Sequence, residues 1–168
     1  MNLADNPIRL IYAALWDLLE ANSLFASHAR KTIKFTGTAM HPELDSVSEA
    51  DVPEVRIVLG GLKPHPYNTS SSSRLTVTYR VQVATGEMLF ASVLDMQWIV
   101  YAALHNWKTH IETLEWNGKT FAKKLTTDEV QDTDSNSKLN RGIRGWSTVW
   151  QGTVDCWFDS SDVAAVGA

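Results

Sequence analysis

The residues of this sequence that could bind a metal are few and scattered. The chain contains five histidines, one cysteine and no Cys-x-x-Cys pair. His105 and His110 stand five residues apart in a predicted helix, which places them roughly 140° apart around the helix axis, so they cannot share one ligand. We therefore interpret the histidines as surface residues and expect neither a zinc site nor any other cofactor.

A second metal pattern begins at Asp132, because the spacing Asp-x-Asp-x-Asn opens a calcium-binding loop. The sixth position of such a loop needs glycine for its turn, and here it is Ser137. The twelfth position needs a bidentate glutamate, and here it is Ile143. With the turn residue and the strongest ligand missing, the pattern indicates a solvated loop and no calcium site.

Residues for covalent or acid–base catalysis are equally sparse. The sequence has no Gly-x-Ser-x-Gly elbow and no glycine-rich phosphate loop. Cys156 alternates with Trp150, Val154 and Phe158 in a predicted strand, which is typical of a small buried apolar residue. Carboxylates concentrate in predicted loops, and although a glycosidase-like pair stays open, no pair stands out. We expect a protein that is not an enzyme.

Tryptophan is the residue type that raises a functional question. Three of the seven tryptophans fall in the segment 145–158, GWSTVWQGTVDCWF. Strand alternation places Trp146 and Trp150 on the face of Val154 and Cys156, so we expect both to pack in the core. Trp157 falls on the other face among polar residues, which favours a contact surface, although a cross-strand aromatic pair explains it equally well.

Aromatic side chains on a sheet can also stack sugars or unpaired bases. The alternative function is therefore an aromatic-platform module that binds carbohydrate or single-stranded nucleic acid.

Composition narrows the class of protein. The chain has 168 residues, of which 44% are apolar and 20% charged, as in a single globular domain. The net charge is −4, so the basic surplus of a protein that wraps nucleic acid is missing. We expect no signal peptide at the start, and no membrane span, because charged or polar residues interrupt the longest apolar run, 88–104.

Hydrophobic periodicity predicts the elements that must position these residues. The expected helices span 7–26 and 87–111, and the expected strands span 32–36, 54–59, 74–84, 112–116, 119–125 and 145–158. Gly60 and Gly61 should end the second strand, and Asn117-Gly118 should form a hairpin turn. We predict an α+β fold: a single mainly antiparallel sheet with two helices packed on one face and long inter-strand loops. One domain should cover residues 1–158, and residues 159–168 should form a flexible C-terminal tail.

The second predicted helix is apolar on nearly all sides. Leu89, Val93, Met96, Val100 and Ala103 share one side, and Phe90, Leu94, Trp98, Tyr101 and Leu104 lie near another. Such a helix has to be covered over most of its surface. A domain of this size has little material for that purpose, so we expect a partner subunit to cover part of the helix.

The order of these segments resembles a known family. An amphipathic helix (PIRLIYAALWDLLEA) precedes the short segments IKF and VRIVL, and the strand RLTVTYRVQVATGE runs straight into a helix. A hairpin region then leads to GWSTVWQGTVDCWF. Over about residues 5–158 this arrangement resembles the tail terminator and neck (tail-completion) proteins of long-tailed bacteriophages.

The resemblance implies a structural protein of the virion neck or tail, assembled in the cytoplasm of the bacterial host. Such proteins form a hexameric ring that caps the tail tube, stops its polymerisation and presents a surface to the head connector. DNA passes through the lumen of the ring without specific binding. The resemblance therefore implies contacts with other copies of the chain, with the tail tube protein and with connector proteins.

The long predicted loops are the candidates for these contacts, because long loops are suited to reach neighbours. The acidic loop 38–54 is the candidate for the lumen or the head-facing rim, since negative walls repel phosphate. The candidate rim residues are Glu43, Asp45, Glu49 and Asp51. The candidate contact residues, mostly in loops 63–73 and 126–141, are Trp157, Lys63, Tyr67, Arg74, Asp128, Glu129, Asp132, Asp134 and Arg141.

Overall fold

The core of the fold is one five-stranded sheet. The computed structural model of the chain describes residues 6–29, 31–33, 53–66, 68–84, 90–130 and 146–166. The strand order is β1-β2-β3-β7-β6, with four antiparallel strands and β1 parallel to β2. The strands are β1 (Lys31–Ile33), β2 (Glu54–Pro64), β3 (Ser72–Ala84), β6 (Ala122–Thr127) and β7 (Trp146–Asp159).

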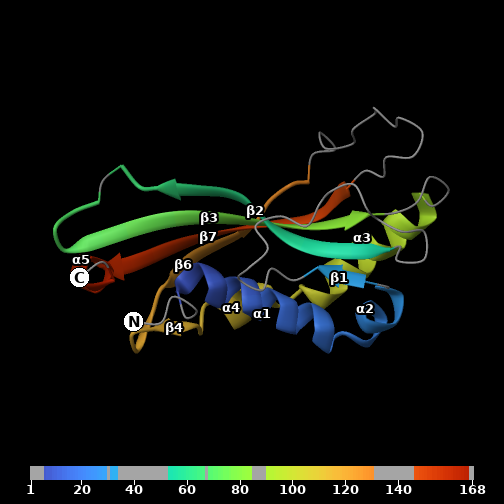
Figure 1. Ribbon diagram of the computed structural model, residues 1–168, viewed down its shortest axis with the longest axis horizontal. Coiled ribbons are helices and arrows are strands. Elements are labelled where there is room, and N and C mark those ends of the chain that lie inside the picture. Colours follow the sequence, from blue (N-terminus) through green and yellow to red (C-terminus); the bar gives the residue numbers. More distant parts are fainter. Residues whose placement is uncertain are drawn as a thin grey trace.

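Helices cover one face of this sheet (Figure 1). They are α1 (Pro7–Ala21), α2 (Ser23–His28), α3 (Phe90–Ala103) and α4 (Trp107–Ile111), with α5 (Ser160–Ala165) after the last strand. A small separate hairpin pairs β4 (Glu115–Trp116) with β5 (Lys119–Thr120). Its turn residues Asn117 and Gly118 have φ angles of 51° and 71°, as the Asn-Gly turn predicts. The predicted α+β class with a mainly antiparallel sheet is confirmed.

The first predicted helix is divided in two at Asn22. The backbone N–H of Asn22 donates to the Leu19 carbonyl at 3.1 Å, which ends α1. Its side-chain Oδ1 accepts from the N–H groups of Leu24 and Phe25 at 3.0 and 3.1 Å, which starts α2. One asparagine thus ends one helix and begins the next, and the change of direction buries Phe25.

The second predicted helix is also divided, by residues 104–106, which form a turn between α3 and α4. The indole Nε1 of Trp107, the first residue of α4, donates to the Thr127 hydroxyl at 3.0 Å. Its ring meets the Trp150 ring edge-to-face, with 5.1 Å between centroids. A continuous helix was therefore the wrong prediction, and its break accompanies the burial of Trp107 in the core.

Strand β2 continues beyond the two glycines that were expected to end it. Leu59 pairs with Tyr79 and Gly61 pairs with Thr78, so Gly60 is the extra residue of a β-bulge. A Cβ atom at Gly60 would lie 2.9 Å from the Arg80 side chain. Gly60 therefore lets the strand bulge past Arg80 and run on to Pro64.

A second bulge, in β7, reverses one sequence-based prediction. Trp150 pairs with Val81 while Thr148 pairs with Gln82, which leaves Val149 as the extra residue. Trp150 is buried on the helix-covered face, as predicted. Beyond the bulge the faces exchange, so Trp146 lies on the opposite face, with the Arg56 guanidinium 4.0 Å from its ring centroid. The prediction that Trp146 packs beside Trp150 was wrong, because strict alternation fails across a bulge.

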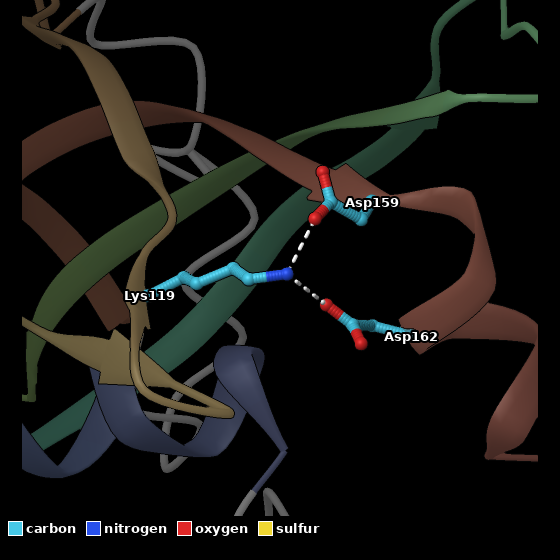
Figure 2. Close-up of polar contacts among 3 residues, drawn as sticks. All are labelled: Lys119, Asp159 and Asp162. Atoms are coloured by element: carbon cyan, nitrogen blue, oxygen red, sulfur yellow. Dashed lines mark hydrogen bonds and ion pairs between the residues drawn. The ribbon is translucent and has the colours of Figure 1, made fainter.

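The described chain ends in a short helix, which lies in the segment that the sequence predicts to be a flexible tail. Strand β7 continues through Asp159 and is followed by α5. Lys119 of β5 donates to Oδ2 of Asp159 at 2.5 Å and to Oδ2 of Asp162 at 3.2 Å (Figure 2). These ion pairs connect the small hairpin with the end of β7 and with α5, although all three side chains remain partly exposed.

Candidate interaction surfaces

Helix α3 exposes a line of large apolar side chains to solvent. Its buried side, formed by Met96, Ile99, Val100 and Ala103, faces the core. On its outer side, Trp98 is 67% exposed, Tyr101 is 58% exposed and Leu94 is about half exposed. The rings of Trp98 and Tyr101 stack with 5.7 Å between centroids. We call Leu94, Trp98 and Tyr101 the α3 stripe; they belong to the second apolar side that the sequence predicted for this helix.

The α3 stripe borders a shallow hollow of about 370 Å³ between α3 and β7. Its floor and walls are Leu94, Gln97, Trp98, Tyr101, Val149 and Trp150. Val149 is the extra residue of the β7 bulge, and the bulge explains how two consecutive residues, Val149 and Trp150, both line the hollow. Because alternation assigns these two residues to opposite faces, the sequence alone does not predict this site.

The outer edge of β2 is a second exposed apolar surface. Strand β1 pairs only with Glu54–Arg56. Along residues 57–64 no other strand of the described chain pairs with β2 on that side. Leu59 is 53% exposed and Leu62 is 49% exposed. Leu59 pairs with Tyr79 and Leu62 pairs with Val77 across the two strands. The bulge at Gly60 therefore places both leucines on the same face of the sheet, although they stand three residues apart. We call Leu59 and Leu62 the β2 edge pair.

The face of the sheet opposite the helices carries a ladder of cross-strand hydrogen bonds. Arg80 Nε donates to Gln151 Oε1 at 2.7 Å, and the Thr76 hydroxyl donates to Asp155 Oδ1 at 2.7 Å. Arg56 Nε donates to Gln82 Oε1 at 2.9 Å, and Gln82 Nε2 donates to the Thr148 hydroxyl at 3.3 Å. Polar side chains that are half buried here find partners within the sheet, which is the usual condition for such groups.

Two of the predicted contact residues come together on this polar face. Arg74 and Trp157 are directly opposite each other on β3 and β7. The Arg74 guanidinium carbon lies 3.7 Å from the Trp157 ring centroid, in a cation–π contact, and the tryptophan remains exposed. Arg74 also lines a mainly apolar hollow of about 410 Å³ between the start of α1, Phe158 and α5.

The other predicted contact residues in the described chain lie apart from this pair. The Asp128 carboxylate, just after β6, accepts hydrogen bonds from Thr153 Oγ1 at 2.5 Å and from Gln151 Nε2 at 3.4 Å. Glu129 is exposed beside it, and Lys63 is exposed near the end of β2. The remaining candidates lie outside the described residues: Tyr67, Asp132, Asp134, Arg141, Glu43, Asp45, Glu49 and Asp51.

The described residues offer little reactive chemistry. Within them, no three histidine, cysteine, aspartate or glutamate side chains are grouped closely enough to hold a metal ion. Burial, with a smaller effect of Asp155, raises the pKa of the Cys156 thiol to about 12. Burial also raises the pKa of Tyr79, whose hydroxyl donates to the Ile8 carbonyl at 2.9 Å. A thiol with such a pKa is protonated at neutral pH and is a poor nucleophile.

None of the helices in the described ranges is long and apolar enough to cross a membrane. A scan against protein-family models gives no match for this chain, and a search of curated proteins gives none either. The function is therefore inferred from the exposed surfaces of the described residues.

Proposed function

We propose that this chain is a non-enzymatic structural protein of the neck or tail end of a long-tailed bacteriophage. It forms a ring, with six subunits as the expected number, that terminates the tail tube and joins it to the head connector. The observation that carries the proposal is the α3 stripe, which leaves two large aromatic rings in solvent.

An exposed apolar stripe of this kind supports an assembly role. Soluble proteins that act as monomers rarely expose contiguous apolar patches of large size, and such patches mark interaction sites. Tryptophan and tyrosine are also the residues that most often dominate the energy of protein–protein contacts. The stripe lies on a helix whose opposite side is fully packed, so folding of the single chain does not need it.

The proposed partners are other copies of this chain, the tail tube protein and connector proteins. DNA passes through the lumen without specific binding, and the net charge of −4 suits a channel that does not grip phosphates. The protein is assembled in the cytoplasm of the bacterial host and ends in the virion.

The test of this function is assembly of the purified chain. Light scattering over a wide concentration range is expected to show a closed oligomer, and electron microscopy is expected to show rings. Added to a tail tube protein that is polymerising, the chain is expected to limit tube length. A chain that stays monomeric at every concentration and leaves tube length unchanged would contradict the proposal.

The contact between Arg74 and Trp157 supports a second candidate function, an aromatic platform for carbohydrate or single-stranded nucleic acid. An exposed tryptophan beside a cation is the kind of surface on which a base or a sugar ring stacks. Titration with oligosaccharides and oligonucleotides is then expected to quench tryptophan fluorescence. The quenching should disappear in Trp157→Ala and persist in the control Trp98→Ala, and an absence of quenching removes this candidate.

A further inference from the structure

We propose that the face of the sheet opposite the helices binds single-stranded nucleic acid at the paired side chains of Arg74 and Trp157. The inference rests on the second candidate function, the aromatic platform, and it deepens that function by choosing between its two ligands. It does not depend on the formation of a ring. Four residues carry it, and we call them the basic platform: Lys63, Arg74, Lys124 and Trp157.

Strand register places the whole basic platform on one face of the sheet. Residues that pair directly across two strands share a face, and so do residues two apart along one strand. One row of paired residues crosses four strands from β2 to β6, and its members are Lys63, Thr76, Asp155 and Lys124. The pair of Arg74 with Trp157 is the next row on the same face. The two lysines therefore stand on the outer strands, on either side of the strands that carry the arginine and the tryptophan.

The cations of the basic platform are available to a ligand. Lys63 and Lys124 are exposed, Arg74 is partly exposed and Trp157 is 42% exposed. Within the described chain, none of the three cations forms an ion pair with a carboxylate. Three positive charges on one face therefore have no negative partner of their own, although the net charge of the chain is −4.

Two carboxylates lie in neighbouring rows of the same face, and both already accept a hydrogen bond. Asp155 Oδ1 accepts from the Thr76 hydroxyl at 2.7 Å. Asp159, one row beyond Trp157, is paired with Lys119. An anionic ligand at the basic platform therefore meets three unpaired cations beside two carboxylates that already hold a donor. The charges favour a ligand with several negative groups.

The stacked pair of Arg74 and Trp157 supplies planes on which bases can lie. The guanidinium carbon is 3.7 Å from the ring centroid, and unpaired bases stack on both aromatic rings and guanidinium planes. Lys63 and Lys124 stand three strand spacings apart, about 14 Å, so one strand of nucleic acid can reach both with its phosphates. A neutral sugar chain could use the tryptophan but has no charged group for the two lysines. The platform therefore fits single-stranded nucleic acid better than carbohydrate.

The test measures binding of a fluorescein-labelled oligodeoxythymidine to the full chain by fluorescence anisotropy. Trp157→Ala should weaken binding at least roughly 5-fold, which is the lower end of the loss of one stacked base. Trp157→Phe keeps an aromatic plane and should keep most of the affinity, which separates lost stacking from lost folding. An oligouridine of the same length should also bind, because the platform has no contact that depends on the 2′-hydroxyl.

The salt dependence of binding tests the two lysines. Lys63→Ala and Lys124→Ala should each reduce the slope of the logarithm of the association constant against the logarithm of salt concentration by about 0.7. The reason is that each variant neutralises one phosphate fewer on a single strand. Lys108→Ala is the control, because Lys108 is an equally exposed lysine on α4, on the helix-covered side. It should leave both the affinity and the slope unchanged.

Other ligands and outcomes decide against the proposal. Duplex DNA hides the faces of its bases, so a duplex that binds as tightly as the single strand overturns the stacking site. Oligonucleotide binding that Trp157→Ala and both lysine variants leave unchanged places the site elsewhere and overturns the inference.

A neutral oligosaccharide, maltohexaose, separates this inference from the candidate function on which it rests. If maltohexaose binds through Trp157 and the oligonucleotides do not bind, the inference is wrong and the aromatic platform stands. If neither ligand binds, both are wrong. Ring assembly, followed by light scattering on the same samples, tests the structural function independently of either result.

Discussion

At the scale of single residues, Gly152 determines how two tryptophans pack. It lies opposite Tyr79 in the middle of β7, on the helix-covered face. A Cβ atom at this position would overlap the six-membered ring of Trp150 and would lie 3.1 Å from the Trp107 ring. The edge-to-face contact between these rings therefore requires a residue without a side chain at position 152.

We predict that Gly152→Ala lowers the free energy of unfolding by about 1–3 kcal/mol, the usual cost of forcing extra atoms into a packed core. Urea denaturation followed by circular dichroism measures the change. Gly61→Ala is the matched control, because no atom lies within 4 Å of its added Cβ. Equal midpoints for the two variants would show that the tryptophan rings can move aside.

At the scale of elements, two asparagines stand at the starts of the short helices α2 and α4, and they act differently. Asn22 caps α2 with two hydrogen bonds from its side chain, whereas Asn106, the N-cap of α4, makes no such bond. Both residues are asparagine, so only the structure separates their roles.

We predict that Asn22→Ala costs about 1 kcal/mol of stability, because the N–H groups of Leu24 and Phe25 lose their acceptor. Asn106→Ala is the control and should change stability by less than about 0.5 kcal/mol. Thermal unfolding of the two variants beside the wild-type chain measures the difference. A larger loss for Asn106→Ala than for Asn22→Ala would contradict the assignment of the cap.

At the scale of the whole molecule, two buried titratable groups and one exposed lysine make stability depend on alkaline pH. The pKa of Cys156 is raised to about 12 and that of Tyr79 is raised as well, in both cases mainly by burial. Both groups therefore lose their protons in the unfolded chain before they lose them in the folded one. The pKa of Lys119 is raised by its hydrogen bonds to Asp159 and, next, to Asp162. The stabilisation that these bonds give the folded chain is therefore fully present below pH 10.5, the ordinary pKa of lysine, and is lost as the pH rises through the pKa of Lys119 in the folded chain.

We predict that these groups leave the free energy of unfolding unchanged between pH 7 and about pH 8.5. Above about pH 9 they lower it. The thiol alone contributes a slope approaching about 1.4 kcal/mol per pH unit above its unfolded pKa, because the unfolded chain binds fewer protons there. Urea titrations at several pH values measure the slope. In Cys156→Ala the decline between pH 9 and 10 should be shallower, and an identical slope in this variant would rule out the thiol as its source.

Local sequence patterns determined a large part of this protein. Two-residue alternation along β3, helical periodicity in α1 and α3, and the Asn117-Gly118 turn are properties of neighbouring residues, and the structure contains each of them. The same periodicity predicted a second apolar side of α3, and in the structure Leu94, Trp98 and Tyr101 of that side are exposed. These features led to the α+β fold and to the expectation of a partner on α3.

Only the tertiary structure decided where the strands bulge and which residues line the exposed surfaces. The bulges at Gly60 and Val149 depend on how β2 and β7 pair with β3 across the sheet. The sequence assigned Trp146 to the core and ended β2 at its glycines, whereas the pairing moved Trp146 to the polar face and brought Leu59 and Leu62 together. The physical reason is that strand register is set by contacts between residues far apart in the chain, and a shift of one residue exchanges the two faces.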